Sequence, residues 1–294
     1  MEEKEYLDLI KKNLEFANKK PFKIMVTATM SAGKSTFINS LTGKNICLAQ
    51  NMACTSKIHY IMNKPYEDGY SYEYDHDLVM TAGKEELLND NELNTTDKII
   101  VSTHFGEELG KQRIVINDSP GVNYSGDKEH KKITDHMLES RDYQLLIYVM
   151  NATQLATNDE DEHLEFIKNT IGRTPVIFVI NKIDALNEEE ENISEIIEKQ
   201  GEYLKKKGFK SPVVCPISSK AGYLAKQFEV RSLARSEKRE LYNYVDKFEQ
   251  MNLLKYYGKY FHEIIVPDSE EEEKQLLKTS GLAYVEKIIN TFVK

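Results

Sequence analysis

A glycine, a lysine and two hydroxyl-bearing residues stand together near the N-terminus, in the segment Ala28-Thr-Met-Ser-Ala-Gly33-Lys34-Ser35-Thr36. An apolar run precedes this segment and a helical pattern follows it, so backbone N–H groups of the loop and of the helix N-terminus point towards one place. Such a loop binds phosphates, with Lys34 as a point charge and the Ser35 hydroxyl as a ligand of Mg²⁺. The predicted contact residues are Ser31, Ala32, Gly33, Lys34, Ser35 and Thr36. The alternative is a Gly-Lys-Ser that opens a helix by chance.

The first glycine that is usual in such loops is missing, and Ala28 stands in its place. We expect its Cβ to crowd a turn that often needs a positive φ, at a strain of about 1 kcal/mol.

A second motif, Asp118-Ser-Pro-Gly121, follows directly on the apolar run Arg113–Asn117. An Asp at the carboxyl end of a buried strand can hold Mg²⁺ through water, and the Gly121 N–H can sense a γ-phosphate. A plain strand-end turn has the same composition, so this motif is weak by itself.

A third motif, Asn181-Lys182-Ile-Asp184, follows the apolar run Pro175–Ile180 and predicts the base. The Asp184 carboxylate can accept hydrogen bonds from both N1–H and the amino group of guanine, which adenine cannot donate. Asn181 is expected to tie this loop to the phosphate loop, and the Lys182 stem to pack over the ring.

A fourth motif, Ser218-Ser219-Lys220-Ala221, follows the run Pro212–Ile217. Its backbone N–H groups are expected to meet guanine O6, and the Lys220 stem the other face of the ring. Four such motifs in this order, each at the end of a strand, predict GTP and GDP as ligands.

The threonine that senses Mg²⁺ in the first switch is less determined by the sequence. We predict Thr55, in Ala-Cys-Thr55-Ser before a strand, with Thr42 at the end of the first helix as the alternative. Val122 follows Gly121, so the water-orienting glutamine of Ras-type enzymes is absent. The candidates for assisting hydrolysis are therefore Ser31 of the phosphate loop and a partner chain docked across the nucleotide. The catalytic candidates are Ser31, Lys34, Thr55 and Gly121, and the metal candidates are Ser35, Thr55 and Asp118.

Short apolar runs separated by helical stretches must position these motifs. The predicted parallel strands are Phe22–Thr27, Arg113–Asn117, Gln144–Met150, Pro175–Ile180 and Pro212–Ile217. With helices over Thr157–Thr170 and Glu188–Lys206, they predict a doubly wound, mostly parallel α/β sheet of the P-loop NTPase class, a Ras-like G domain.

Two stretches interrupt this alternation. An extended first-switch region, Ile46–Lys111, holds strand-like pieces at Lys57–Met62, Tyr70–Asp75 and Lys98–His104. A charged stretch at about 223–278 reads as an added helical segment, whose Glu270–Glu273 run we interpret as a solvated face. An amphipathic helix over Lys4–Asn18 precedes the domain, and a closing helix follows Ser280-Gly281.

The composition limits the partners. A net charge of −9 argues against nucleic-acid binding, which needs a basic surface. Cys47, Cys54 and Cys215 have no paired or metal-ligand spacing, and the charged N-terminus lacks a signal sequence, so we expect a reduced, cytoplasmic protein.

With these residues identified, the chain resembles the bacterial branch of the dynamin-like GTPases. The stretch from Met30 to Leu41 is similar to that branch's phosphate loop and first helix, Ser-Ala-Gly-Lys-Ser-Thr-Leu-Ile-Asn-Ala-Leu. The resemblance implies a leading, neck-type helix at residues 1–20 and a GTPase domain at residues 21–294. It also implies that Ser31 helps to place the attacking water and a charge-compensating Na⁺ or K⁺ in the active site.

In this family two GTPase domains pair face to face across their nucleotides, so the resemblance implies a homodimer whose turnover is linked to membrane remodelling or tethering. Members carry a long helical stalk with a membrane-binding tip, which this chain lacks. We therefore expect it to be part of a longer protein, cut before the stalk, that is peripheral at the inner face of a membrane; an intact small relative is the alternative. Met30 departs from the glutamine of eukaryotic dynamins.

Two other functions share the motifs. An Era-type GTPase associated with the ribosome or RNA has all four, but such proteins usually carry a basic RNA-binding domain. A monomeric GTP switch that needs an external activator is the other alternative.

Overall fold

A mixed sheet runs through the chain, for which the computed structural model describes residues 3–47, 58–74, 78–79, 98–121, 128–187, 192–257, 266 and 268–293. Within these residues the sheet has nine strands in the order β4-β3-β5-β2-β6-β1-β7-β8-β9. The central strand β1 (Phe22–Ala28) pairs in parallel with β6 (Ile114–Asp118) and with β7 (Leu145–Asn151). Parallel pairing continues through β8 (Val176–Asn181) to β9 (Val213–Pro216). The five predicted parallel strands are confirmed, with ends that differ by at most one residue.

The predicted strands of the first-switch region widen this sheet beyond β6. Strand β2 (Ile58–Asn63) runs antiparallel to β6, while β5 (Lys98–Thr103) lies parallel to β2. The short strands β3 (Tyr72–Tyr74) and β4 (Leu78–Val79) complete that edge in antiparallel pairs. Side chains of β2 alternate between buried and half-buried, as expected where the sheet is covered less evenly than at β1.

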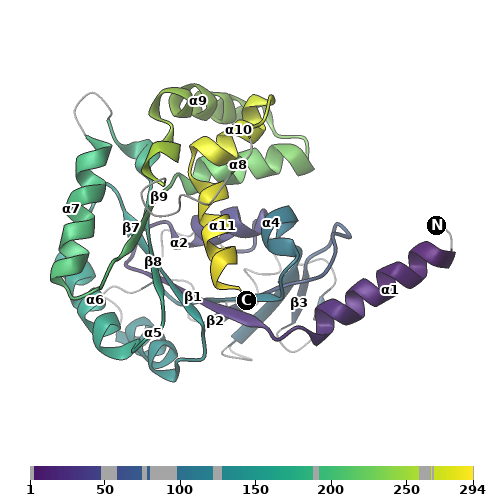
Figure 1. Ribbon diagram of the computed structural model, residues 1–294, viewed down its shortest axis with the longest axis horizontal. Coiled ribbons are helices and arrows are strands. Elements are labelled where there is room, and N and C mark those ends of the chain that lie inside the picture. The colour runs from purple at the N-terminus through teal and green to yellow at the C-terminus, as the bar shows by residue number, and fades with distance from the viewer. Residues whose placement is uncertain are drawn as a thin grey trace.

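Helices cover both faces of the sheet (Figure 1). One face carries α5 (Lys128–Ser140), α6 (Asn158–Thr170) and α7 (Ile193–Lys206). The other carries α2 (Lys34–Thr42), α8 (Ser219–Val230) and α11 (Leu282–Phe292), with the short α4 (Gly106–Gly110) beside them. This arrangement confirms the predicted doubly wound, mostly parallel α/β fold.

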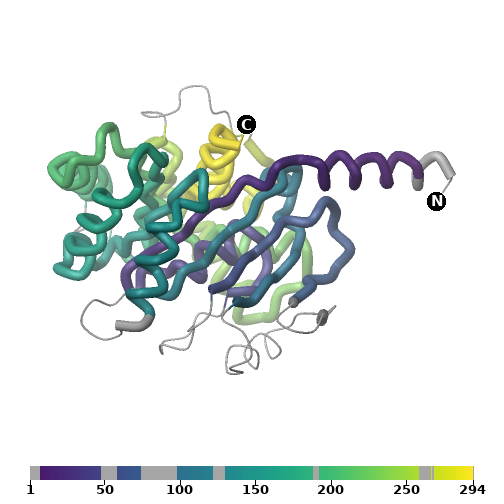
Figure 2. Tube along the Cα trace, turned by 90° about the horizontal axis from the view of Figure 1, so that it is seen from below, coloured from purple at the N-terminus to yellow at the C-terminus, as the bar shows by residue number. Residues whose placement is uncertain are grey.

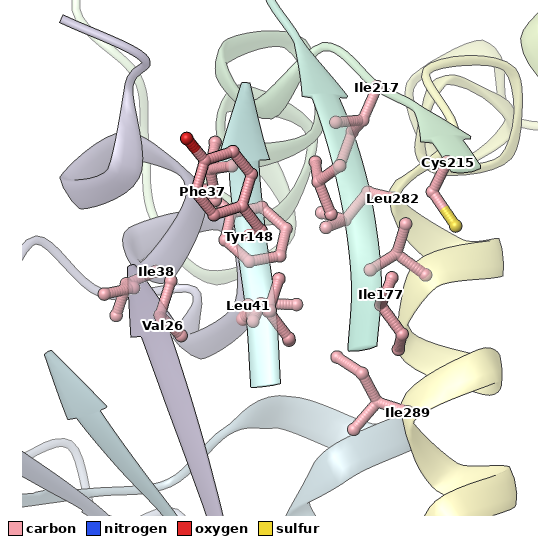
Figure 3. Packing of buried hydrophobic residues seen from close by; sticks show 14 of the residues in the cluster. Val26, Phe37, Ile38, Leu41, Tyr148, Ile177, Cys215, Ile217, Leu282 and Ile289 are labelled. Carbon is pink, nitrogen blue, oxygen red and sulfur yellow. The ribbon is translucent and has the colours of Figure 1, made fainter. Parts of the chain in front are cut away.

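One apolar cluster fills the space between the sheet and the helices. Figure 3 shows members of this cluster from α2, β7, β8 and α11, among them Phe37, Tyr148, Ile177 and Leu282. A buried cation joins three helices beside it, because Lys226 of α8 donates to the carbonyl of Leu41 in α2 at 2.9 Å and pairs with Glu286 of α11. The core and this ion pair hold α2, α8 and α11 together.

The charged C-terminal stretch is helical, as predicted. It contains α9 (Arg235–Met251), the 3₁₀ turn η2 (Leu253–Tyr256) and α10 (Glu272–Thr279), which lie together above α8 (Figure 1). Lys274 pairs with Glu271, and Tyr242 of α9 donates to Glu273, so the acidic run takes part in surface contacts.

The predicted N-terminal helix is α1 (Glu3–Asn18), and it projects away from the rest of the molecule (Figures 1 and 2). Its base is attached where Arg113 donates to the carbonyls of Ala17 and Lys19. The apolar stripe is uncovered, since Leu7, Ile10 and Leu14 are 51%, 53% and 59% exposed. Among the described helices none is both long enough and apolar enough to span a bilayer.

Candidate functional site

The predicted phosphate loop joins the end of β1 to the start of α2. Two of its residues have a positive φ, Ser31 at 62° and Gly33 at 84°. The expected crowding at Ala28 is wrong, because Ala28 is the last residue of β1, where the backbone is extended and a Cβ causes no strain. The tight part of the loop begins beyond it.

Gly33 is required by a close approach as well as by its φ. A Cβ at this position would lie 2.5 Å from Asn181 Nδ2. That amide donates to the carbonyl of Ala32 at 3.0 Å and to that of Gly33 at 3.4 Å. The contact that the sequence predicts between Asn181 and the phosphate loop is therefore present.

A second asparagine, which the sequence analysis missed, holds the same loop. Asn151 ends β7 and is the register partner of Asn181 at the end of β8. Its Nδ2 donates to the carbonyl of Ser31 at 3.4 Å, while its Oδ1 accepts from the backbone N–H and the hydroxyl of Thr153. Two neighbouring strands thus support three consecutive carbonyls of the loop. An asparagine directly after the run Leu145–Met150 was the available signal.

Lys34 and Asp118 meet at the carboxyl ends of β1 and β6, where they form an ion pair with side chains 11% and 6% exposed. Ser35 follows Lys34 as the second residue of α2. The hydroxyl of Ser35 and the carboxylate of Asp118 supply the oxygen donors that Mg²⁺ prefers. The residues present therefore fit this ion.

Two further buried side chains lie beside Asp118. The Cys47 Sγ, a His59 ring nitrogen and an Asp118 carboxylate oxygen lie within 4.8 Å of one another. Strand register explains part of this, since His59 of β2 is paired with Asp118 of β6, which the sequence spacing could not reveal. Burial, followed by the negative charge of Asp118, raises the pKa of the Cys47 thiol well above its usual range. The Lys34 ammonium balances the negative charge of Asp118 in this corner.

The predicted base-recognition segments also come together. The Oδ1 of Asn181 accepts from the backbone N–H of Ser219 at 3.1 Å, so this one residue joins the phosphate loop to the fourth motif. Asp184 lies half-buried in the turn η1 (Ile183–Ala185), which follows Lys182 at a φ of 63°. The Ser219 hydroxyl is buried without a hydrogen-bond partner among the described residues.

Ser218 and Lys220 have structural partners. The Ser218 hydroxyl caps α8 by accepting from the Ala221 N–H, and the Ser218 N–H donates to the carbonyl of Ser280 at 3.0 Å. The Lys220 ammonium, on an exposed side chain, pairs with Glu240 of α9. The fourth motif is thus held both by the start of the closing helix and by α9.

The remaining candidates are placed less completely. Gly121 is described, and a Cβ added to it would meet no atom of the described residues within 4 Å, whereas Thr55 lies outside the described residues. The alternative to Thr55 is engaged elsewhere, because the buried Thr42 hydroxyl bonds to the carbonyl of Asn39 at the end of α2. Thr36 lies in the first turn of α2.

Two buried titratable groups of α6 contact the end of β1 and the loop after β7. Burial lowers the pKa of His163 to about 3, and its Nε2 lies 3.0 Å from the hydroxyl of Thr27 in β1. Burial raises the pKa of Glu160 to about 7, although its carboxylate accepts from the backbone N–H of Ala156 at 2.5 Å. Ala156 has a φ of 56°, so Glu160 holds a constrained residue in the loop that follows Asn151.

Comparison with known proteins extends the argument beyond geometry. The sequence model described as Dynamin family matches residues 24–183, which include the phosphate loop, Asp118 and Asn181. The chain is 24% identical over 184 residues to a bacterial dynamin-like protein of Nostoc punctiforme, an alignment that covers 57% of this chain and 25% of the relative.

Solved structures show the same fold. One from a study of an oligomerised bacterial dynamin pair, described as a mechanism for the long-range sensing and tethering of membranes, superposes with a TM-score of 0.53 at 18% identity. That alignment covers all of this chain and 51% of the other chain. A second structure from the same pair gives a TM-score of 0.51 at 18% identity and covers 99% of this chain and 50% of the other. This chain therefore spans about half the length of those structures and a quarter of the curated relative.

Proposed function

Since this chain belongs to the dynamin family, we propose that it binds GTP with Mg²⁺ and hydrolyses it to GDP and phosphate. The observation that carries this proposal is the meeting of Lys34, Asp118 and Asn181 around one loop at the carboxyl ends of β1, β6 and β8. Open α/β sheets bind their ligands at this edge, outside the carboxyl ends of the strands. The match to the dynamin family favours this function over the Era-type alternative.

Each side of the site has its own task in this proposal. Lys34 leaves Asp118 to contact the β- and γ-phosphates, whose negative charge replaces that of the carboxylate. The N–H groups of the loop and of α2 surround the same phosphates. Asp184 reads N1–H and the amino group of guanine, while Lys182 and the segment Ser218–Lys220 enclose the ring. The buried Ser219 hydroxyl, which has no partner among the described residues, supports a ligand at this place.

Ser35, Asp118 and Thr55 would hold Mg²⁺, with Asp118 acting through water. The ion supplies charge neutralisation at the β- and γ-phosphate oxygens. Ser31 is proposed to orient the attacking water and to help bind Na⁺ or K⁺. Its carbonyl is fixed by Asn151, so its side chain has a defined starting position. Gly121 contributes its N–H near the γ-phosphate.

We further propose that the GTPase domain, residues 21–294, pairs with a second copy across the nucleotide. The leading segment, residues 1–20, then pairs through the uncovered stripe of α1 with helices elsewhere in a longer protein, as in a neck. Support comes from the exposure of Leu7, Ile10 and Leu14 and from the oligomerised, membrane-tethering relative. Action on membranes, at the inner face, belongs to those other parts. Nucleic acid is not an expected partner.

The first test is GTP turnover per molecule as a function of protein concentration, in K⁺, in Na⁺ and in neither, with ATP as a control. A specific activity that rises with concentration and requires a monovalent cation supports catalysis at a dimer. A flat, slow rate favours the monomeric switch and rejects the paired mechanism. Equal turnover of ATP, or unchanged turnover in Lys34→Ala, rejects the proposed site itself.

A further inference from the structure

Helix α9 lies against both segments that the proposed function assigns to guanine. Glu240 pairs with Lys220 of the fourth motif. Tyr244 donates its hydroxyl to Asp184 Oδ2 over 3.5 Å, and Lys247 donates to the carbonyls of Asp184 at 2.8 Å and Leu186 at 3.2 Å. The helix thus touches the side chain and the backbone of the residue that reads the base.

The spacing of these three residues makes them one surface. Positions 240, 244 and 247 are four and three residues apart, so their side chains share a face of the helix. The adjacent face anchors α9 in the core through Leu241 and Phe248, both fully buried, and the Tyr244 and Phe248 rings lie 6.3 Å apart. A helix fixed in this way can hold its polar face in a constant position.

Asp184 needs such support for a chemical reason. It lies in a three-residue turn, half-exposed, and must direct both carboxylate oxygens towards guanine. Each carboxylate oxygen can accept more than one hydrogen bond, so a Tyr244 bond to Oδ2 leaves room for the base. Lys247 restricts the backbone on both sides of Ala185, which limits rotation of the turn itself.

We propose that Glu240, Tyr244 and Lys247 form a base brace: positioning residues that orient the guanine-reading Asp184 and Lys220 and so set the selectivity for guanine over related bases. The inference rests on the proposed function, because it assigns a role only if guanine binds at Asp184. Burial and then the negative charges of Asp184 and Glu240 raise the pKa of Tyr244, so its hydroxyl keeps the proton that it donates.

If these residues act as a brace, their substitution changes how well the base is recognised and leaves phosphate binding unchanged. Hypoxanthine keeps N1–H but lacks the amino group of guanine, so the ratio of GDP to IDP affinity measures how well Asp184 is aligned. We expect Tyr244→Phe to lower that ratio about 3- to 10-fold, the net contribution of a typical intramolecular hydrogen bond. Lys247→Met is expected to lower it by a similar factor through the backbone.

The experiment is a calorimetric titration of the full chain with GDP and with IDP, for wild type and each variant, after thermal unfolding has shown that the variant folds. Tyr242→Phe is the matched control, because Tyr242 lies on the same helix but donates to Glu273 of α10 at 3.0 Å. Tyr244→Phe is also measured in an Asp184→Asn background, where the brace has no carboxylate to orient.

A fall of the ratio in Tyr244→Phe, its constancy in Tyr242→Phe and the absence of a further fall in the Asp184→Asn background are the expected results. An equal loss of GDP and IDP affinity, or an unchanged ratio in both Tyr244→Phe and Lys247→Met, overturns the brace. Failure of the proposed function is distinguishable, since the wild-type chain would then not bind GDP, or Lys34→Ala would bind it as well as wild type.

Discussion

The proposed phosphate side and the proposed base side of the site are supported in different ways. Residues from Ser31 to Ser35 lie on one continuous strand–loop–helix segment, held by Asn151 and Asn181 from the next two strands. The base side consists of short turns after β8 and β9, and these are held by Tyr244 and Lys247 of α9 and by Ser280, which lie 60 to 63 positions further along the chain.

This difference shows how one site combines local and distant information. The phosphate loop has its geometry because a strand must turn into a helix there. The turns after β8 and β9 have their geometry because α9, a helix distant in sequence, packs over them. Substitutions on the phosphate side should therefore change the affinity for every nucleotide that binds. Substitutions on the base side should change the selectivity for guanine.

The largest expected effect is on the phosphate side. Lys34→Ala should weaken GTP binding by about 1000-fold, because it removes the charged contact with the β- and γ-phosphates. A titration with a fluorescent GTP analogue measures this loss. Lys44→Ala is the control, since Lys44 pairs with the exposed Glu67 at 2.9 Å. An affinity within 10-fold of wild type would remove Lys34 from the site.

On the base side, Asp184→Asn should lower GTP affinity about 100-fold and favour xanthosine triphosphate, because the amide can donate to the carbonyl that xanthine carries in place of the amino group. Competition between the two nucleotides measures the change. Asp246→Asn, on the exposed part of α9, controls for loss of one negative charge. An unchanged preference for GTP would show that Asp184 does not read the base.

The contact between the two sides can be tested at Gly33. Gly33→Ala adds strain at a φ of 84° and a Cβ 2.5 Å from Asn181 Nδ2, so we expect GDP affinity to fall about 10-fold as the loop separates from Asn181. Gly69→Ala is the matched control, with a φ of 83° and no atom within 4 Å of the new Cβ. It should lose about 1 kcal/mol of stability from strain and keep its GDP affinity. Equal losses in both variants would mean that strain alone matters.

The smallest expected effect is on the pH dependence of stability, through Glu160 of α6. The folded pKa of Glu160, about 7, lies above its ordinary value of 4.5, so its contribution to stability is complete below pH 4.5 and is lost as the pH rises through 7. Glu160→Gln keeps the acceptor for Ala156 and removes this loss. We expect the variant to gain about 1 kcal/mol over wild type at pH 8, a shift of about 2–4 °C in Tm, and less at pH 5.

The contribution of His163 to stability depends on pH in the opposite direction. Its folded pKa of about 3 lies below 6.5, so its contribution is present above pH 6.5 and is lost as the pH falls towards 3. Thermal unfolding of wild type and Glu160→Gln between pH 5 and 8 separates the two groups. Glu162→Gln, on the exposed face of α6, is the control. A difference in Tm that does not change with pH would contradict the assignment to Glu160.

Sequence reasoning succeeded where the information is local. The five parallel strands appear as uninterrupted apolar runs because both of their faces are buried. The loop from Ser31 to Ser35 follows from the strand before it and the helix after it. The family resemblance, carried by the same residues, is confirmed.

Sequence reasoning failed where the local geometry depends on residues that are distant in the chain. Ala28 was expected to be strained because the start of the turn was placed too early. Asn151 and His59 acquire their neighbours from strand register, which spacing along the chain does not contain. The contacts of α9 depend on how a charged helix packs, and its polar face at Glu240, Tyr244 and Lys247 cannot be distinguished by composition from the solvent-exposed residues around it.

The pairing of β1 has a consequence for the order of events during synthesis. Phe22 is the register partner of Ile114, and its N–H donates to the carbonyl of Arg113 at 2.8 Å, so the central strand emerges from the ribosome long before this parallel neighbour. Contacts of such long sequence separation form slowly, and the turn that holds Ser218 waits for Ser280. In the proposed function, the base side is complete only after the chain has been synthesised as far as Ser280. GTP and GDP would therefore stabilise this folded domain and not its early fragments, by a free energy that grows with the logarithm of the nucleotide concentration.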